Sequence, residues 1–323
     1  MNKKLVKTIC ALILMISTIL LFGCTSNVED KPYTLEFNSK SYDGLFTGVM
    51  TDGIPNEEGK FVCGEEGTQN YLIYEGGWEN GAPKGKGTLS TDNYIVHFPK
   101  TDVNDAFDRT GEYIGETIDG IANGQGKFKA VNGNNQEYTY DGEWKDGLWN
   151  GYGVRSYTNN DSFSEIGKFI NGDYDPELAD LVVSLGTNQK NCPYSLSDEA
   201  YNFIKEHEEI FVKHSKKKID KLSPKEFSIG TFKKNASEYK PRLVEVSWLY
   251  ILQAFEENFG GYDLTYELAT DQDGNIYSLY YIGKSDNIAE GNEVRTIFMP
   301  LGYSTYTAVN GNTPWAVSGL IAY

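Results

Sequence analysis

Cys24 is the residue whose type and position most clearly predict a chemical modification. Three lysines within the first seven residues precede an apolar run of 14 residues from Ile9 to Phe22, and Cys24 follows at its end in the order Leu21-Phe22-Gly23-Cys24. A basic start and an apolar segment of this length are typical of a secretory signal. A bilayer-spanning helix needs roughly 20 apolar residues. We therefore favour an exported chain with a thiol at the cleavage point over an uncleaved membrane anchor, and both alternatives export the protein.

The Leu-Phe-Gly-Cys order resembles the signal of bacterial lipoproteins. The resemblance implies removal of the signal peptide, residues 1–23, and attachment of a diacylglyceryl group to Cys24. Residues 24–41 would then form an acylated N-terminus and tether. Because two acyl chains suffice for stable attachment, we expect an extracytoplasmic protein that is lipid-anchored to the bacterial cell membrane.

Length and charge limit the classes of partner. Without residues 1–23 the chain keeps 300 residues, enough for about two domains. Three of its 29 lysines and arginines lie in the removed segment, so 26 basic residues remain against 46 acidic ones, a formal net charge of −20. Such a charge repels nucleic acids and anionic bilayers. Cys63 and Cys192 could pair in an exported protein, although two reduced thiols are favoured in so cysteine-poor a chain.

Glycine recurs in a fixed pattern between residues 46 and 172. Five units start at residues 46, 74, 113, 140 and 165, the last one degenerate, and each contains an Asp-Gly or Asn-Gly pair. Such pairs predict two-residue type I′ turns, because both turn positions need positive φ. Each unit is therefore expected to form a β-hairpin. The glycines of these structural turns are Gly53, Gly81, Gly120, Gly147 and Gly172.

The pattern aromatic-x-Gly-x-aromatic-x-Asx-Gly resembles the MORN repeat, most clearly from Tyr140 to Gly153. The resemblance implies an elongated antiparallel sheet of hairpins over residues 42–180, with 173–180 as a terminal cap, and a scaffolding role. The 39-residue interval between the second and third units predicts a loop or an extra strand pair within 91–108. We place Trp149 and Tyr152 outside the alternation that faces the core, which makes them candidates for a binding surface. A packing role is the alternative for any single aromatic ring.

Residues 181–225 are expected to form a helical linker. Ser197 is a good N-cap, and the apolar spacing that follows predicts one amphipathic helix to about His214. The lysines between Lys213 and Lys225 fit the solvated end of a helix. A lipid-headgroup patch is the less favoured alternative. None of the three histidines has a partner at metal-ligand spacing, so no metal site is expected.

Residues 226–323 are expected to form a small β-barrel, with strands at 242–252, 263–270, 275–282, 293–301 and 315–321. The segment resembles a bacterial OB-like domain in its stretches Leu243–Ser247, Asp271–Tyr277 and Pro300–Tyr306. OB-folds bind oligonucleotides or oligosaccharides, and Tyr303 and Tyr306 could stack on a ligand. A nucleic acid is not expected on an acidic, exported chain. Asp271 to Asn275 fits a hairpin turn rather than a calcium loop, because the EF-hand glycine and glutamate are absent.

The sequence contains none of the common catalytic motifs, and no cofactor is expected. We therefore predict a mainly β, non-enzymatic adaptor or scaffold that binds protein or glycan partners through the repeat sheet and the OB-like module. The alternative is a cell-envelope hydrolase that uses a pair of carboxylates without a recognisable motif.

Overall fold

The computed structural model describes residues 24–99, 107–158, 163–189, 192–235, 241–305 and 314–323. The signal segment 1–23 and Tyr306 lie outside the described residues. The protein is mainly β, with 61% of residues in strands and 14% in helices. It divides into a first unit, residues 1–95 with 112–124, and a second unit, residues 96–111 with 125–323.

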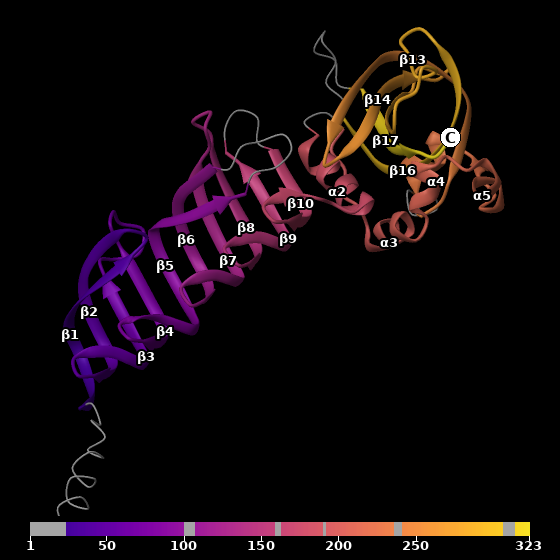
Figure 1. Cartoon of the computed structure of the whole chain (residues 1–323). Helices are drawn as coiled ribbons and strands as arrows, with labels where there is room; N and C mark the ends of the chain where they lie inside the picture. Colours follow the sequence, from indigo (N-terminus) through magenta and orange to yellow (C-terminus); the bar gives the residue numbers. More distant parts are fainter. Residues whose placement is uncertain (1–23, 100–106, 159–162, 190–191, 236–240, 306–313) are drawn as a thin grey trace, which may run out of the picture. The chain divides into compact units, whose positions relative to one another are not determined.

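The first unit is an antiparallel sheet whose strands follow the order of the sequence (Figure 1). Its strands are β1 (Thr25–Phe37), β2 (Lys40–Thr51), β3 (Ile54–Cys63), β4 (Leu72–Glu79), β5 (Ala82–Phe98), β6 (Phe107–Ile118) and β7 (Ile121–Val131). Strands β5, β6 and β7 each have residues in both units.

Strand β1 occupies most of residues 24–41, the segment that was expected to be a tether. It begins at Thr25, directly after Cys24, and pairs with β2 as far as Phe37. Leu35 is buried, and the ring of Tyr33 lies 6.5 Å from that of Trp78 in a T-shaped arrangement. Alternate apolar side chains on β1 thus cover the aromatic face of the sheet, and this burial places residues 24–41 in a hairpin instead of a flexible linker.

The second unit continues the same strand order from the ends of β5, β6 and β7. Its further strands are β8 (Glu137–Lys145), β9 (Leu148–Tyr157), β10 (Phe163–Ile170) and β11 (Asp173–Tyr174). In the interval expected to hold a loop or an extra strand pair, β5 continues to Phe98 and β6 begins at Phe107, while residues 100–106 lie outside the described residues.

All five Asx-Gly pairs form the two-residue turns between strands. The Asp or Asn has φ between 51° and 53°, and the glycine has φ between 75° and 94°. Positive φ at both positions is the requirement of a type I′ turn, whose twist matches that of the flanking strands. Local backbone chemistry therefore positions each hairpin.

Glycines in the second strand of a hairpin make room for an aromatic ring of the first strand. A Cβ at Gly87 would lie 2.4 Å from the hydroxyl of Tyr74, and one at Gly153 would lie 2.6 Å from the hydroxyl of Tyr140. The ring and the glycine that makes room for it therefore belong to the same hairpin. The hydroxyls of Tyr74 and Tyr140 then donate to the backbone oxygens of Gly77 and Glu143.

Helix α2 (Leu178–Asn188) covers the edge of β10. Ser184 exchanges hydrogen bonds with the backbone of Ile166, and Asn188 does the same with Ser164 at 2.7 Å in both directions. An unpaired strand edge invites association with another chain. The cap of the sheet is thus this helix, and the expected capping segment 173–180 contributes only its start and the short strand β11.

Three short helices replace the single helix expected from Ser197 to His214: α3 (Asp198–Glu206), α4 (Glu208–Val212) and α5 (Lys216–Lys221). Ser197 does cap α3, accepting from the backbone N–H of Ala200. His207 leaves the helical region at φ −124°, and its ring lies 4.6 Å from that of Phe203. The break turns Phe211 toward the same apolar core as Ile204.

The C-terminal strands close into a ring. They are β13 (Val244–Phe259), β14 (Tyr262–Thr270), β15 (Ile276–Ile282), β16 (Glu293–Thr305) and β17 (Trp315–Ile321), bonded in the order β13-β14-β15-β17-β16 with β16 returning to β13. Strands β15 and β17 are parallel. The short strand β12 (Lys225–Glu226) joins β13, and helix α6 (Ile229–Lys234) follows.

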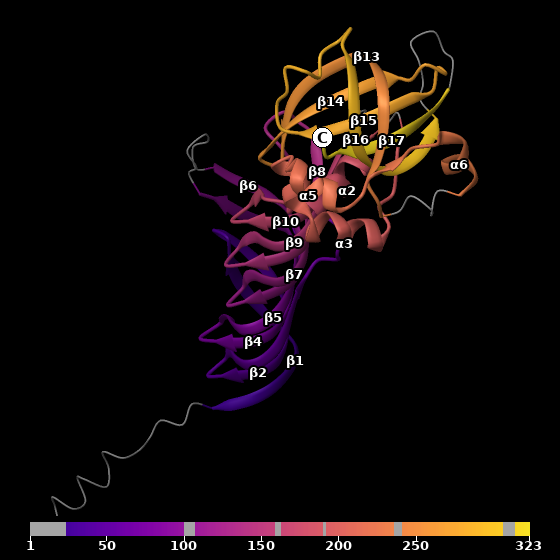
Figure 2. The ribbon, with the colours of Figure 1, turned by 90° about the vertical axis from the view of Figure 1, so that its right-hand side faces the viewer.

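Successive residues on these strands point alternately into two hydrophobic cores. Leu264, Tyr266 and Leu268 pack with the helices, which lie against one side of the ring (Figure 2). Ala269, Leu279 and Phe298 pack with Val317 inside the ring. Thr265 and Glu267 alternate with the helix-facing residues and so share the inner face.

Candidate functional site

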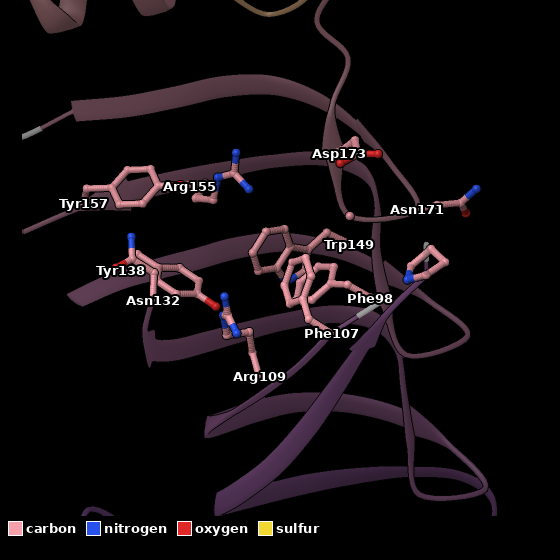
Figure 3. A pocket seen from close by; sticks show the side chains of 12 residues that line it. Phe98, Phe107, Arg109, Asn132, Tyr138, Trp149, Arg155, Tyr157, Asn171 and Asp173 are labelled. Carbon is pink, nitrogen blue, oxygen red and sulfur yellow. The ribbon is translucent and has the colours of Figure 1, made fainter. Parts of the chain in front are cut away.

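A hollow of about 260 Å³ lies on the repeat sheet of the second unit, and we call it the arginine pocket (Figure 3). Aromatic rings and two guanidinium groups dominate its lining. The lining residues are Phe98, Pro99, Phe107, Arg109, Asn132, Tyr138, Trp149, Arg155, Tyr157, Asn171, Gly172 and Asp173.

Trp149 forms the apolar floor of the arginine pocket. It is 2% exposed and stacks on Tyr140 with ring centroids 4.7 Å apart and an interplanar angle of 13°. The prediction that Trp149 lies on an exposed surface is therefore wrong. In the β8–β9 hairpin Trp144 pairs directly with Trp149. Residues opposite one another in an antiparallel pair point to the same face, so Trp149 follows Trp144 into the core.

Arg155 of β9 reaches the pocket from beside Trp149. Its guanidinium lies 5.3 Å from the Trp149 ring and donates from Nε to the Glu165 carboxylate. Burial alone lowers the pKa of Arg155, but the hydrogen bond and charge of Glu165 raise it further than burial lowers it. Arg155 therefore stays charged. Its hydrogen bond to Glu165 uses only Nε, so the two terminal nitrogens remain available to donate to a ligand.

Arg109 of β6 supplies the second positive charge. Its guanidinium lies 4.4 Å from the ring of Phe107, and Nη1 donates to the backbone oxygen of Asp108 at 3.2 Å. Figure 3 shows Arg109 and Arg155 on either side of the Trp149 ring in this view. Guanidinium groups hold carboxylates through paired N–H donors, so this arrangement suits a negatively charged group.

The indole N–H of Trp149 is a further unmatched donor. It is buried and has no hydrogen-bond partner among the described residues. A buried donor without an acceptor costs on the order of 1–3 kcal/mol. The arginine pocket thus combines two guanidinium groups and this indole N–H with aromatic rings, and the chemistry that satisfies it is an acceptor-bearing, partly apolar group.

Tyr152, the neighbouring candidate, has a different environment. Its side chain is 48% exposed, and its hydroxyl donates to Asp180 and lies 3.0 Å from the hydroxyl of Tyr201. Burial of the hydroxyl and its bond to Asp180 raise the pKa of Tyr152. Tyr152 therefore joins β9 to helices α2 and α3 and does not line the arginine pocket.

On the C-terminal ring, Tyr303 stacks on Trp315 with centroids 4.8 Å apart and an interplanar angle of 13°. Trp315 is 52% exposed, and the sequence analysis did not select it. The two residues belong to the paired strands β16 and β17. They offer an exposed aromatic surface that is separate from the arginine pocket.

A second hollow, of about 410 Å³, opens into the ring, and we call it the barrel cavity. Two carboxylates, Glu267 of β14 and Glu293 of β16, contribute to its lining. Within the described residues no group of three or more His, Cys, Asp or Glu side chains is placed to hold a metal ion.

Sequence reasoning missed both arginines and the phenylalanines beside them. Phe98 and Arg109 lie in the long interval between the second and third units, which has no repeat pattern to follow. That interval was the available signal, because an insertion in a repeat array often carries function. Their convergence with Arg155 depends on the pairing of strands, which spacing alone does not reveal.

Three segments of the chain, residues 74–94, 113–135 and 140–162, match the family model of the MORN repeat. The protein therefore contains three MORN repeats, and the units that start at 46 and 165 share their turn geometry without matching the model. No curated protein matches the chain. None of the described helices is long and apolar enough to cross a membrane.

Proposed function

We propose that this protein is a lipid-anchored extracytoplasmic adaptor that holds a protein partner at the arginine pocket of its MORN-repeat sheet. The observation that supports this function is that the guanidinium groups of Arg109 and Arg155 line one hollow with Trp149, whose indole N–H has no partner among the described residues. MORN repeats suggest a binding or scaffold role. The pocket adds a specific chemistry to that role.

The partner in this proposal presents a carboxylate next to an apolar side chain. The carboxylate accepts from the guanidinium groups, and the apolar group packs against Trp149 and Phe107. A cavity of about 260 Å³ admits one or two side chains rather than a folded element. A segment of polypeptide meets these requirements, and an acidic sugar is the competing ligand in the test below.

A matched pair of small probes tests this chemistry. N-acetylphenylalanine carries a ring and a carboxylate, whereas its amide lacks only the negative charge. We expect the acid to bind the unlipidated protein at least tenfold more tightly than the amide, as measured by NMR titration. Arg109→Gln should remove that preference, because a lost charge-assisted hydrogen bond costs about 1.5–3 kcal/mol.

Lys129→Gln is the control, since Lys129 is an exposed residue of the same unit that lies 3.7 Å from Glu137 and outside the pocket. Equal binding of acid and amide to the wild type would contradict the proposal. Stronger binding of glucuronate than of N-acetylphenylalanine would indicate that the partner is a glycan and not a protein.

Attachment through Cys24 is the second part of the proposal. Cys24 is exposed, its backbone N–H donates to Asp52 at 2.9 Å, and β1 starts at the next residue. A diacylglyceryl group on this thiol would therefore hold β1 close to the lipid surface. Mass spectrometry of protein from membranes should find a diacylated Cys24 as the first residue. Cys24→Ala should lose stable membrane association, and a retained segment 1–23 on the wild type would contradict this assignment.

The negative net charge leads to a related expectation for the protein without its lipid group. Residues 25–323 should not bind phosphatidylglycerol vesicles at physiological salt, because an acidic protein is repelled by an anionic surface. Co-sedimentation measures this directly. Salt-sensitive binding would instead assign the lysines from Lys213 to Lys225 to a lipid-binding surface.

We further propose that the C-terminal ring is an OB-like module. Its bonded order, first-second-third-fifth-fourth strand with a parallel third and fifth pair, supports this proposal. The stacked Tyr303 and Trp315 are its candidate contact surface. Trp315→Ala should weaken binding of a carbohydrate ligand by about 1–3 kcal/mol if the pair stacks on a ring.

A hydrolase remains the second candidate because Glu267 and Glu293 line one cavity. Glycoside hydrolysis needs two carboxyl groups on opposite sides of the scissile bond, one of them with a raised pKa. Glu267 is 0% exposed, which favours a binding role over contact with a large substrate. Release of reducing ends from a glycan mixture, lost in both Glu267→Gln and Glu293→Gln, would favour the hydrolase.

A further inference from the structure

Glu267 is a buried carboxyl group without a partner. Its side chain is 0% exposed, and neither Oε1 nor Oε2 has a hydrogen-bond partner among the described residues. It lies on the inner face of β14 opposite Leu279 of β15. A carboxyl group in either protonation state has hydrogen-bonding capacity, so this position leaves that capacity unmet.

The basic groups around the barrel cavity already have acceptors. Arg295 donates to both carboxylate oxygens of Glu245, at 2.7 and 2.8 Å. The two ring nitrogens of His214 lie 3.0 Å from the backbone oxygen of Ala322 and 2.9 Å from that of Ile282. These contacts leave no basic side chain for Glu267 within the part of the chain that the structure describes.

The second carboxylate of the cavity is also unpaired. Glu293 lies on β16 and forms no ion pair with any described residue. The two carboxyl groups of the barrel cavity thus lack a positively charged partner among the described residues, and the rest of the lining includes apolar side chains such as Ile288, Val294 and Ile321. A complementary ligand carries a donor-rich cation on an aliphatic chain.

We propose that the barrel cavity binds a primary alkylammonium group, with Glu267 as the acceptor of its N–H donors. The ammonium offers three donors and no acceptor, which matches the two unpartnered carboxyl oxygens of Glu267. A metal ion fits less well, since three clustered oxygen or nitrogen ligands of the usual types are absent from the described residues. The alkylammonium could be a free amine or the lysine side chain of a protein.

Proton linkage gives a readout that is specific to Glu267. Burial raises the pKa of Glu267 to about 7. An alkylammonium pairs with the ionised carboxylate, so binding near neutral pH must release a proton from Glu267, and affinity must fall as the pH drops below 7. The other titratable or charged groups of the cavity are His214, Tyr281, Glu293, Arg295 and Tyr323, and Lys216 lies 5.9 Å from the Tyr323 ring.

The test uses n-butylammonium and the neutral isostere n-butanol with the full mature chain. Calorimetry in buffers of different ionisation enthalpy should show saturable binding of the amine at pH 8 and proton release at pH 6.5. In NMR spectra of protein labelled with ¹³C-glutamate, one δ-carbon signal should titrate near pH 7 and shift when the amine is added. That signal should be absent from the spectrum of Glu267→Gln.

Glu267→Gln should lower the affinity for n-butylammonium at least tenfold, while Glu206→Gln, an exposed change at the end of α3, should leave it unchanged. If Glu267→Gln fails to fold, a single wild-type δ-carbon that titrates near pH 7 and shifts on addition of the amine still provides the result. Tighter binding of N-acetyllysine methylamide than of n-butylammonium would identify the lysine of a protein as the source. Binding of n-butanol equal to that of the amine, amine binding without a shift of Glu267, or displacement of the amine by calcium would overturn the proposal.

Discussion

The arginine pocket and the barrel cavity have opposite hydrogen-bond deficits. Among the buried side-chain atoms without a partner in the described residues, the arginine pocket holds the indole N–H of Trp149, whereas the barrel cavity holds the carboxyl oxygens of Glu267. The first therefore selects an acceptor and the second a donor. One chain thus offers two sites of complementary chemistry, and a ligand with only one kind of group should distinguish them.

The two regions also differ in how their polar groups are positioned. In the repeat sheet, each hairpin is set by its own turn, and the tyrosine hydroxyls of Tyr74 and Tyr140 bond to residues three positions later. In the ring, Glu267 is enclosed because strands far apart in sequence close around it. Local interactions satisfy these tyrosine hydroxyls, whereas the non-local closure of the ring leaves the carboxyl group of Glu267 without a partner among the described residues.

Removal of the Trp149 ring is the largest expected perturbation. Trp149→Ala deletes a buried indole that contacts Tyr140, Phe98 and Phe169. Burial losses of this kind cost about 3–5 kcal/mol. Hydrogen exchange should accelerate in β8 to β10 and remain nearly unchanged in β14 and β15. An equal effect in the ring strands would show that the two regions unfold together and would weaken the comparison.

The pH dependence of stability should separate the two regions next. Folding raises the pKa of Glu267 from 4.5 to about 7, so between these pH values the folded protein holds a proton that the unfolded chain has lost. The free energy of unfolding of the ring should therefore fall as the pH rises from 4.5 to 7, by roughly 3 kcal/mol from this group, and level off above.

Glu267→Gln should lack that decline, and amide exchange of β14 and β15 measured across the same pH range would show it. The repeat strands serve as an internal control, because none of their residues lines the cavity that holds Glu267. An unchanged slope in Glu267→Gln would mean that this carboxyl is not held in its neutral form.

A change at one repeat turn should have a smaller effect. Gly147 has φ of 82°, and valine at this position places a β-branched residue in a strained conformation at a cost of about 1–3 kcal/mol. The melting temperature of the repeat sheet should fall. Gly147→Asn is the matched control, since asparagine tolerates positive φ, and its effect should be clearly smaller. Similar melting temperatures for both variants would argue against a conformational requirement at Gly147.

Tyr152→Phe should produce the smallest effect of the series. It removes the hydroxyl that bonds to Asp180 while the ring remains, and Tyr201 still donates to the same carboxylate at 2.8 Å. We expect a loss of about 1 kcal/mol, seen as faster exchange in α2 without a change in carboxylate binding. A loss of N-acetylphenylalanine binding in this variant would extend the arginine pocket to Tyr152.

The sequence alone determined the features that depend on neighbouring residues. The Asx-Gly pairs specified their turns because the positive φ of both residues is a local requirement. The five expected C-terminal strands agree with β13 to β17, although β13 and β16 extend further. Alternating apolar residues and turn signals suffice for such elements.

Only the tertiary structure decided which side chains meet and which remain without partners. Trp149 was misplaced because its face depends on its pairing with Trp144 across the hairpin. Arg109 and Arg155 are 46 positions apart in the numbering and converge only through the order of the strands. Glu267 resembles any other glutamate in a β-strand until β16 returns to β13, and closure of that ring removes the water that would otherwise solvate its carboxyl group.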